Sequence, residues 1–264
     1  MRGISGLAVA LCLWAASAAA DPKLAPVFAP QGELRAVINT GNAVLARRVE
    51  GQPATGVSVD LVNELAKRLG VSVRQVVVPA AAMAVDAIRQ GNADVGFFAI
   101  DPARSEGISF SPPYVSIAGA YAVPQNSPIT RMEEVDRPGI RIVVGRNSAY
   151  DLFLSRQIKT ATLVRTQTSQ SVVLQLFEQK FEVAANVRQQ LEADVAKYPG
   201  ALRLLPGDFM TIHQAMGLAG GRDPAGLAFL TAFVEDMKSS GFVRDALKRH
   251  GIAGASVSAP GMPK

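Results

Sequence analysis

Apolar runs of strand length alternate with amphipathic segments of helical period along most of this 264-residue chain, and the alternation limits the folds that it can adopt. The first third predicts a strand over residues 34–38, a helix over 57–69, a strand over 71–78, a helix over 83–90 and a strand over 95–100. This order is typical of a mainly parallel β-sheet covered by helices. The sequence therefore predicts an α/β fold.

The alternation starts again after a polar, proline-containing patch at residues 125–138. Strands are predicted over 140–144, around 162–164 and over 181–185, and helices from about 148, over 169–179 and over 188–197. The chain continues with an extended segment over 213–219 and with helices over 224–237 and 242–250. Two successive α/β patterns suggest two lobes, although no repeat of fixed period is evident.

The first twenty residues have the composition of a secretory signal peptide. Arg2 provides a positive start, residues 4–14 form an apolar run, and residues 18–20 are a small-residue cleavage site before Asp21. We expect cleavage between Ala20 and Asp21 and export of a soluble protein to the periplasm. The single cysteine lies inside this segment, so the mature chain has no disulfide and depends on burial for its stability.

The charge and the motifs of the chain exclude several classes of function. Residues 1–20 contain one basic and no acidic residue, which leaves 26 basic against 22 acidic side chains and a formal charge of +4 in the mature chain. This mild excess is spread along the chain and does not predict a nucleic-acid surface. His213 and His250 lie far apart, and the chain has no Gly-x-Ser-x-Gly, phosphate-binding loop or Gly-x-Gly-x-x-Gly motif. We therefore expect no catalytic residue, no cofactor and no metal.

A lone arginine and a helix start are the candidates for binding an anion. Arg104 follows the predicted strand over 95–100 and an Asp-Pro turn, where its guanidinium could hold a carboxylate with two parallel hydrogen bonds. Ser148 resembles a capping residue at a helix start, where free N–H groups favour negative charge. A surface arginine and a simple helix cap are the alternatives. Asn39 and Asn42 are either turn residues or polar contacts of a ligand.

Five motifs follow one another in a characteristic order over most of residues 32–250. They are Gly32 to Ala36, Gly56 to Leu61, Ala66 to Val71, Ala87 to Val95, and Asp101 to Arg104 followed by Phe110 to Tyr114. In this order they resemble the bacterial extracytoplasmic solute-binding proteins of family 3, the amino-acid-binding components of ABC importers.

The resemblance implies a periplasmic binding protein-like type II fold, in which two α/β lobes are joined by two crossing strands. It implies a first lobe over residues 21–120 and 214–252 and a second lobe over 121–213. The implied crossings are residues 119–123 and 213–218. The segment over 253–264 is small and proline-containing, and we expect it to be a flexible tail.

The resemblance also implies a function. A monomeric periplasmic component would capture an amino acid or a related small carboxylate by hinge closure and deliver it to an inner-membrane ABC permease. A dehydratase-like enzyme and an accessory subunit without a solute, both on the same fold, are the alternatives. The implied ligand contacts are Arg104, Asn39, Asn42, Phe97, Ala99, Ser148, Ala149 and Asn186.

Five positions depart from the pattern of the family. Asp101 replaces a threonine, Ala99 replaces a hydroxyl residue, and Asn42 and Ala81 stand where aromatic residues often enclose the ligand. Asn186 stands where an acidic residue usually pairs with an α-ammonium group. Because an ammonium buried without a carboxylate is costly, an organic acid or an unusual amino-acid derivative is an alternative ligand. Asp101 either restores the negative charge in the cleft or caps its own turn.

Overall fold

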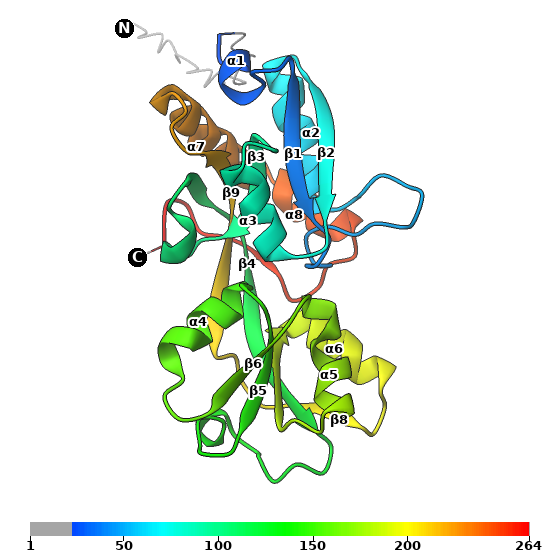
Figure 1. Cartoon of the computed structure of the whole chain (residues 1–264). Helices are drawn as coiled ribbons and strands as arrows, with labels where there is room; N and C mark the ends of the chain where they lie inside the picture. The colour runs from blue at the N-terminus through cyan, green and yellow to red at the C-terminus, as the bar shows by residue number, and fades with distance from the viewer. Residues whose placement is uncertain (1–22, 264) are drawn as a thin grey trace, which may run out of the picture.

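The computed structural model describes residues 23–263, in which ten strands form one mixed β-sheet. Figure 1 shows two helix-covered lobes joined by two long strands, β4 (Ile108–Pro124) and β9 (Met210–Ala219). This is the α/β fold of two lobes and two crossing strands that the sequence predicts. The predicted signal peptide lies outside the described residues.

The first lobe is built on three parallel strands. β1 (Glu33–Asn39) pairs with β2 (Ser72–Val78) on one side and with β3 (Val95–Ala99) on the other. Parallel strands need a crossover, and helices provide it here. The helices of this lobe are α1 (Ala25–Phe28), α2 (Val57–Leu69), α3 (Ala81–Arg89), α7 (Pro224–Ser239) and α8 (Phe242–Arg249).

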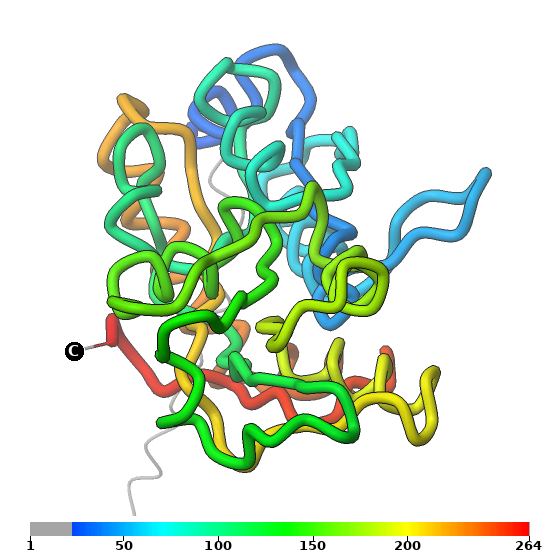
Figure 2. The backbone as a smooth tube through the Cα atoms, turned by 60° about the horizontal axis from the view of Figure 1, so that its bottom comes forward, coloured from blue at the N-terminus to red at the C-terminus, as the bar shows by residue number. Residues whose placement is uncertain are grey.

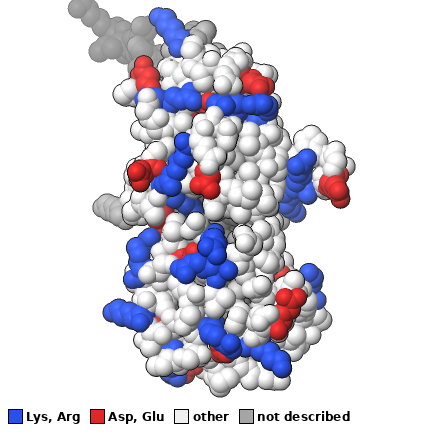
Figure 3. Space-filling view, in the orientation of Figure 1, with Lys and Arg blue, Asp and Glu red and all other residues white. Residues whose placement is uncertain are grey.

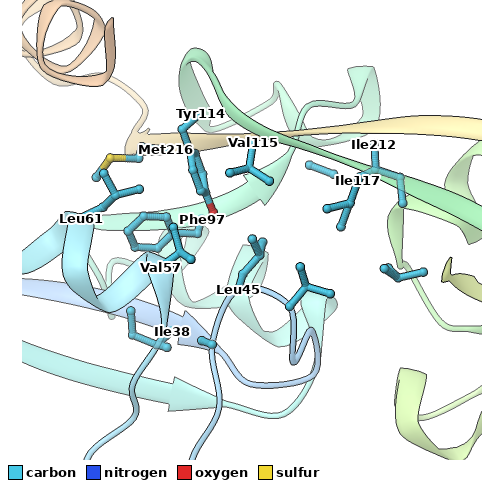
Figure 4. Close-up of a cluster of buried hydrophobic side chains, with 14 of the residues drawn as sticks. Ile38, Leu45, Val57, Leu61, Phe97, Tyr114, Val115, Ile117, Ile212 and Met216 are labelled. Carbon is cyan, nitrogen blue, oxygen red and sulfur yellow. The ribbon is translucent and has the colours of Figure 1, made fainter. Parts of the chain in front are cut away.

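Helix α2 shows why the apolar periodicity predicts the fold well in this lobe. Leu61, Leu65 and Leu69 recur at helical spacing, and all three are buried. The helix ends at Gly70, whose φ of 69° lies in the left-handed region that favours glycine. Figure 4 shows the first of these leucines beside Phe97 of β3, in a cluster of buried apolar side chains. The predicted helix over 57–69 is therefore confirmed.

The second lobe repeats the parallel arrangement. β5 (Arg141–Gly145) pairs in parallel with β6 (Thr162–Thr166) and β7 (Val183–Val187), and a short strand, β8 (Leu202–Leu204), pairs with β4. Its helices are α4 (Ala149–Gln157), α5 (Val172–Glu178) and α6 (Arg188–Lys197). Short 3-10 helices are η1 (Pro102–Arg104), η2 (Met132–Glu134) and η3 (Ser169–Ser171).

The two crossing strands run antiparallel from one lobe into the other. Their register extends from Ile108 opposite Ala219 to Gly119 opposite Met210, with shifts on either side of Pro113. Proline lacks the N–H that a regular ladder needs, which explains the irregularity there. A Cβ atom at position 119 would lie 2.9 Å from the ring of Phe209, so glycine allows that ring to pack against β4.

A group of three charged side chains holds the segment after β9 against the first lobe. The carboxylate of Asp94, just before β3, is inaccessible to solvent and accepts hydrogen bonds from Arg35 Nη2 at 2.9 Å and Arg222 Nη2 at 2.6 Å. Burial alone would raise the pKa of Asp94, but hydrogen bonds from the two arginines outweigh it and hold the pKa below its ordinary value. The group therefore links β1 to the segment between β9 and α7.

The C-terminal segment differs from the flexible tail predicted over 253–264. Residues 256–257 form a short strand, β10 (Ser256–Val257), which pairs with β4 at Val115 and Ser116. Ser258 continues the contact, since its hydroxyl lies 2.7 Å from the Ser116 hydroxyl. This stretch of β4 lies beyond the part that β7 covers, so one edge of the strand is open to the tail.

A loop between β1 and α2 projects from the first lobe in Figures 1 and 2. Arg47 and Thr55 form an isolated antiparallel bridge at its base. Basic and acidic side chains are interspersed over the face drawn in Figure 3. No helix in residues 23–263 combines the length and the apolar character that crossing a membrane requires.

Candidate functional site

A cavity of about 380 Å³ is lined by residues of both lobes. Its walls come from the loop after β1, the end of β3 with η1, the start of α4, the end of β7 with α6, and β9. A volume of this size is typical of sites for small molecules. All eight residues that the sequence predicts as ligand contacts line this one cavity: Asn39, Asn42, Phe97, Ala99, Arg104, Ser148, Ala149 and Asn186.

Arg104 is the buried cation of the cavity. Only 4% of the residue is exposed, and burial lowers the pKa of its guanidinium to about 10 although the charge of Asp101 opposes the change. Nη1 donates to the carbonyl of Ala99 at 3.1 Å, and Nη2 donates to the carbonyl of Asn147 in the other lobe at 2.8 Å. Among the described residues no carboxylate forms an ion pair with Arg104. Its remaining N–H groups are therefore free for a ligand.

Asp101 caps its own turn and does not line the cavity. Its Oδ1 accepts from the Ala103 N–H at 2.9 Å, as the turn-capping alternative predicts. Its Oδ2 lies 2.7 Å from Arg156 Nη2, on helix α4 of the opposite lobe. The aspartate that replaces the threonine of the family motif thus forms an ion pair between the lobes instead of supplying a negative charge to the cavity.

The start of α4 forms the wall opposite Arg104. Ser148 caps the helix, because its hydroxyl accepts from the Asp151 N–H at 3.0 Å. The Asp151 carboxylate accepts from the Asn147 N–H at 2.8 Å and pairs with Arg165 at 3.0 Å. Asn147 has a φ of 54°, and asparagine is one of the few residues that adopt this conformation readily. The bonds around it hold the carbonyl that Arg104 contacts.

Asn186 lines the cavity, but both ends of its amide are bonded to the protein. Nδ2 donates to the carbonyl of Ser169 at 2.8 Å, and Oδ1 accepts from the Val187 N–H at 2.8 Å. The Ser169 hydroxyl also accepts from Tyr150 Oη at 2.7 Å, and burial raises the pKa of this tyrosine to about 12. Asn186 therefore orders the wall formed by η3.

The two asparagines after β1 make turns of their own. Asn39 Oδ1 accepts from the Gly41 N–H at 2.9 Å, and Asn42 Oδ1 accepts from the Val44 N–H at 3.3 Å. The two predicted alternatives, turn residue and contact of a ligand, are compatible here because both residues also line the cavity.

Gln214 is a cavity residue that the sequence analysis missed. It lies on β9, is 5% exposed and lines the cavity, and its side-chain amide has no hydrogen-bond partner within residues 23–263. The signal in the sequence is a polar residue in the otherwise apolar extended segment over 213–219. No three His, Cys, Asp or Glu side chains in the described part of the chain are grouped so that they could hold a metal ion.

Comparison with known proteins places this architecture among solute-binding proteins. A sequence profile of the bacterial extracellular solute-binding proteins, family 3, matches residues 37–251. A putative binding component of an ABC transporter from Wolinella succinogenes, solved with lysine, has a TM-score of 0.71 at 21% identity over 83% of this chain and 95% of its own. The solute receptor for L-cysteine of Neisseria gonorrhoeae has a TM-score of 0.72 at 21% identity over 84% of this chain and 90% of its own.

One curated relative is an enzyme. The membrane-bound lytic murein transglycosylase F of Maricaulis maris is 32% identical over 152 residues, which are 56% of this chain. The chain spans about a third of the length of that relative, since the match covers 32% of it.

Proposed function

Since this chain belongs to the bacterial extracellular solute-binding proteins of family 3, we propose that it is the solute-capturing component of an ABC importer. It acts in the periplasm, where it takes up a small carboxylate, an amino acid or a related acid, and delivers it to a permease of the inner membrane. The lobes close on the solute about β4 and β9, and the permease recognises the closed form.

The observation that carries the proposal is the buried guanidinium of Arg104 at the cavity. A cation removed from water is unfavourable unless an anion or several acceptors compensate for it. Arg104 has two carbonyl acceptors and no carboxylate among the described residues, while a guanidinium has five N–H donors. A carboxylate in the cavity would supply the missing negative charge and accept from the donors that remain.

Contacts between the lobes support closure around the solute. Besides the bond from Arg104 to Asn147, the Asp101–Arg156 ion pair and a bond from Gln170 Nε2 to the carbonyl of Thr40 at 3.1 Å join the lobes. All three contacts lie outside the two crossing strands. They would be lost if the lobes moved apart and regained when a solute brings them together.

Binding experiments test this function directly. A thermal-shift screen of amino acids and organic acids should find a solute that raises the melting temperature in a saturable way, because a ligand that binds only the native state stabilises it. Titration calorimetry with that solute should then show binding to the wild type and a loss of affinity in Arg104→Ala. Arg244→Ala is the matched control, since Arg244 is exposed on α8 and its one ion pair among the described residues is with its neighbour Asp245. Equal affinity in wild type and Arg104→Ala would refute the proposed site.

The charges around the cavity favour binding over turnover. A dehydratase-like enzyme needs an acid or base among the groups that touch the substrate. The charged residues that line the cavity are Arg47, Arg104 and Glu192, and the Glu192 side chain is half exposed and lies 3.9 Å from Arg188. Turnover of prephenate or arogenate by the purified protein would contradict the binding-only function.

A further inference from the structure

Residues 23–263 give the buried part of the cavity one positively charged side chain and no negatively charged one. Of the three charged residues that line it, Arg104 is buried, whereas Arg47 and Glu192 are exposed. Three buried carboxylates lie close in the sequence to cavity residues, and each already has a partner. Asp101 pairs with Arg156, Asp151 pairs with Arg165, and Asp194 accepts a hydrogen bond from Gln190 Nε2 at 3.3 Å. None of the three lines the cavity. A solute that enters this part of the cavity therefore finds a partner for an anion and none for a cation.

Gln214 adds a neutral polar group beside the cation. It is the direct antiparallel partner of Ala99, and Cα atoms of such partners lie about 4.5–5.5 Å apart with their side chains on one face. The carbonyl of Ala99 in turn accepts from Arg104. The small side chain of Ala99 leaves room above this part of the sheet, so the amide of Gln214 and the guanidinium of Arg104 are close enough to contact one small molecule.

The amide of Gln214 has no hydrogen-bond partner in the described part of the chain and lines the cavity, so its donors and its acceptor are available to a ligand. An amide has donors and an acceptor, so it fits a hydroxyl group or a carbonyl oxygen equally well. An ammonium group at the same place would be a second buried cation near Arg104, and Glu192, the one acidic residue among residues 23–263 that lines the cavity, is exposed. The amide of Gln214 and the guanidinium of Arg104 thus favour an uncharged oxygen of the ligand at this place and disfavour an ammonium group.

From this arrangement, and resting on the function proposed above, we infer that the cleft selects small carboxylates with an uncharged oxygen on the neighbouring carbon, 2-hydroxy or 2-oxo acids, over the matching α-amino acids. Arg104 binds the carboxylate, and Gln214 hydrogen-bonds the neutral oxygen and is the residue that determines this specificity.

Matched sets of acids test the inference. Each set combines an amino acid with the 2-hydroxy and 2-oxo acids of the same side chain, such as alanine, lactate and pyruvate, or phenylalanine, phenyllactate and phenylpyruvate. Thermal shift identifies the set that binds best, and titration calorimetry on protein freed of solute by unfolding and refolding gives the affinities. We expect the best oxygen-bearing acid to bind at least tenfold more tightly than its amino acid.

Substitutions of Gln214 give a second, independent test. Gln214→Glu supplies the missing carboxylate, so the preference should reverse toward the amino acid, whereas Gln214→Leu should weaken the oxygen-bearing acid at least tenfold. Gln214→Ala gives the same test if the longer substitutions do not fold, as judged by circular dichroism. Gln179→Leu, at the exposed end of α5, is the matched control and should bind like wild type.

The possible failures are distinguishable. Tighter binding of the amino acid in the best set, or wild-type selectivity in Gln214→Glu, overturns the inference and leaves solute capture standing. If no acid of these sets and no other acid in the screen binds in a saturable way, the proposed function is contradicted and the inference is overturned with it.

Discussion

Replacing Arg104 by methionine should separate the stability of the protein from its affinity for a solute. Methionine has about the length of the aliphatic part of arginine and no charge, so it keeps the packing of that part and removes the guanidinium. If Arg104 serves the ligand, the solute-free protein loses little when the charge is removed. If Arg104 serves the fold, the solute-free protein is destabilised and binding is unaffected.

The expected magnitudes follow from the surroundings of the guanidinium. Burial lowers the pKa of Arg104 from its ordinary value to about 10. Because each tenfold change in proton affinity corresponds to about 1.4 kcal/mol, the buried charge disfavours folding by roughly 3 kcal/mol. The two bonds to carbonyls together return about 3–6 kcal/mol, so the free energy of unfolding should fall by no more than about 3 kcal/mol in Arg104→Met. Loss of two charge-assisted bonds to a carboxylate should lower affinity at least 100-fold, by a similar estimate of about 3–6 kcal/mol.

Urea unfolding followed by circular dichroism, with and without solute, measures both quantities on the same samples. Wild type should gain stability with solute and Arg104→Met should not, while Arg244→Met should match wild type throughout. A loss of more than about 3 kcal/mol in the solute-free variant, the size expected when a buried ion pair is broken, combined with unchanged affinity would refute the assignment of Arg104 to the ligand.

Three further predictions concern the framework of the site. Asp94→Asn leaves the buried Arg35 and the partly buried Arg222 without an anion and should lower the free energy of unfolding by about 3–5 kcal/mol. Since the folded-state pKa of Asp94 is depressed, its stabilisation should be present above the ordinary pKa of an aspartate and lost as pH falls through the lower value, as urea unfolding at several pH values would show. Asp101→Asn keeps the turn cap but weakens the partly exposed pair with Arg156, and it should reduce solute affinity a few-fold in titration calorimetry, with a smaller difference from wild type at high salt. Gly41→Ala would place a Cβ atom 2.3 Å from the carbonyl oxygen of Pro79 beside the cavity, so thermal unfolding should begin at a lower temperature and calorimetry should show weaker binding.

Local patterns in the sequence predict much of the framework. The helix over 57–69 follows from the spacing of its leucines and from Gly70 at its end. Both signals are local, since each involves residues that are neighbours on the same helix. The resemblance to a family predicts several further residues of the site, because the order of the motifs identifies Arg104 and Ser148 as ligand contacts and both line the cavity. The helix is thus predicted from local sequence, and the two site residues are predicted from motifs that the chain shares with its family.

The parts that the sequence does not predict depend on contacts between distant residues. Asp101 and Arg156 lie 55 positions apart and meet only because η1 and α4 face each other across the cavity. Gln214 has the sequence surroundings of any polar residue in a strand, and only the pairing of β9 with β3 turns it toward the cavity wall. The short β10 depends on the open edge of β4, which no feature of residues 253–264 reveals.

The order of the strands in the sheet has a consequence for how the chain folds during its synthesis. The parallel strands of the second lobe, β5, β6 and β7, lie within residues 141–187, so they can pair as soon as that stretch is available. The first lobe cannot be completed until β9 and Arg222 have been synthesised. Its strand β3 pairs with β9, and Asp94 accepts a hydrogen bond from Arg222, 128 positions later. Until then, the edge of β3 that β9 later covers is open, and such edges promote aggregation. The lobe that begins first is therefore completed last, and we expect chains truncated before residue 210 to aggregate.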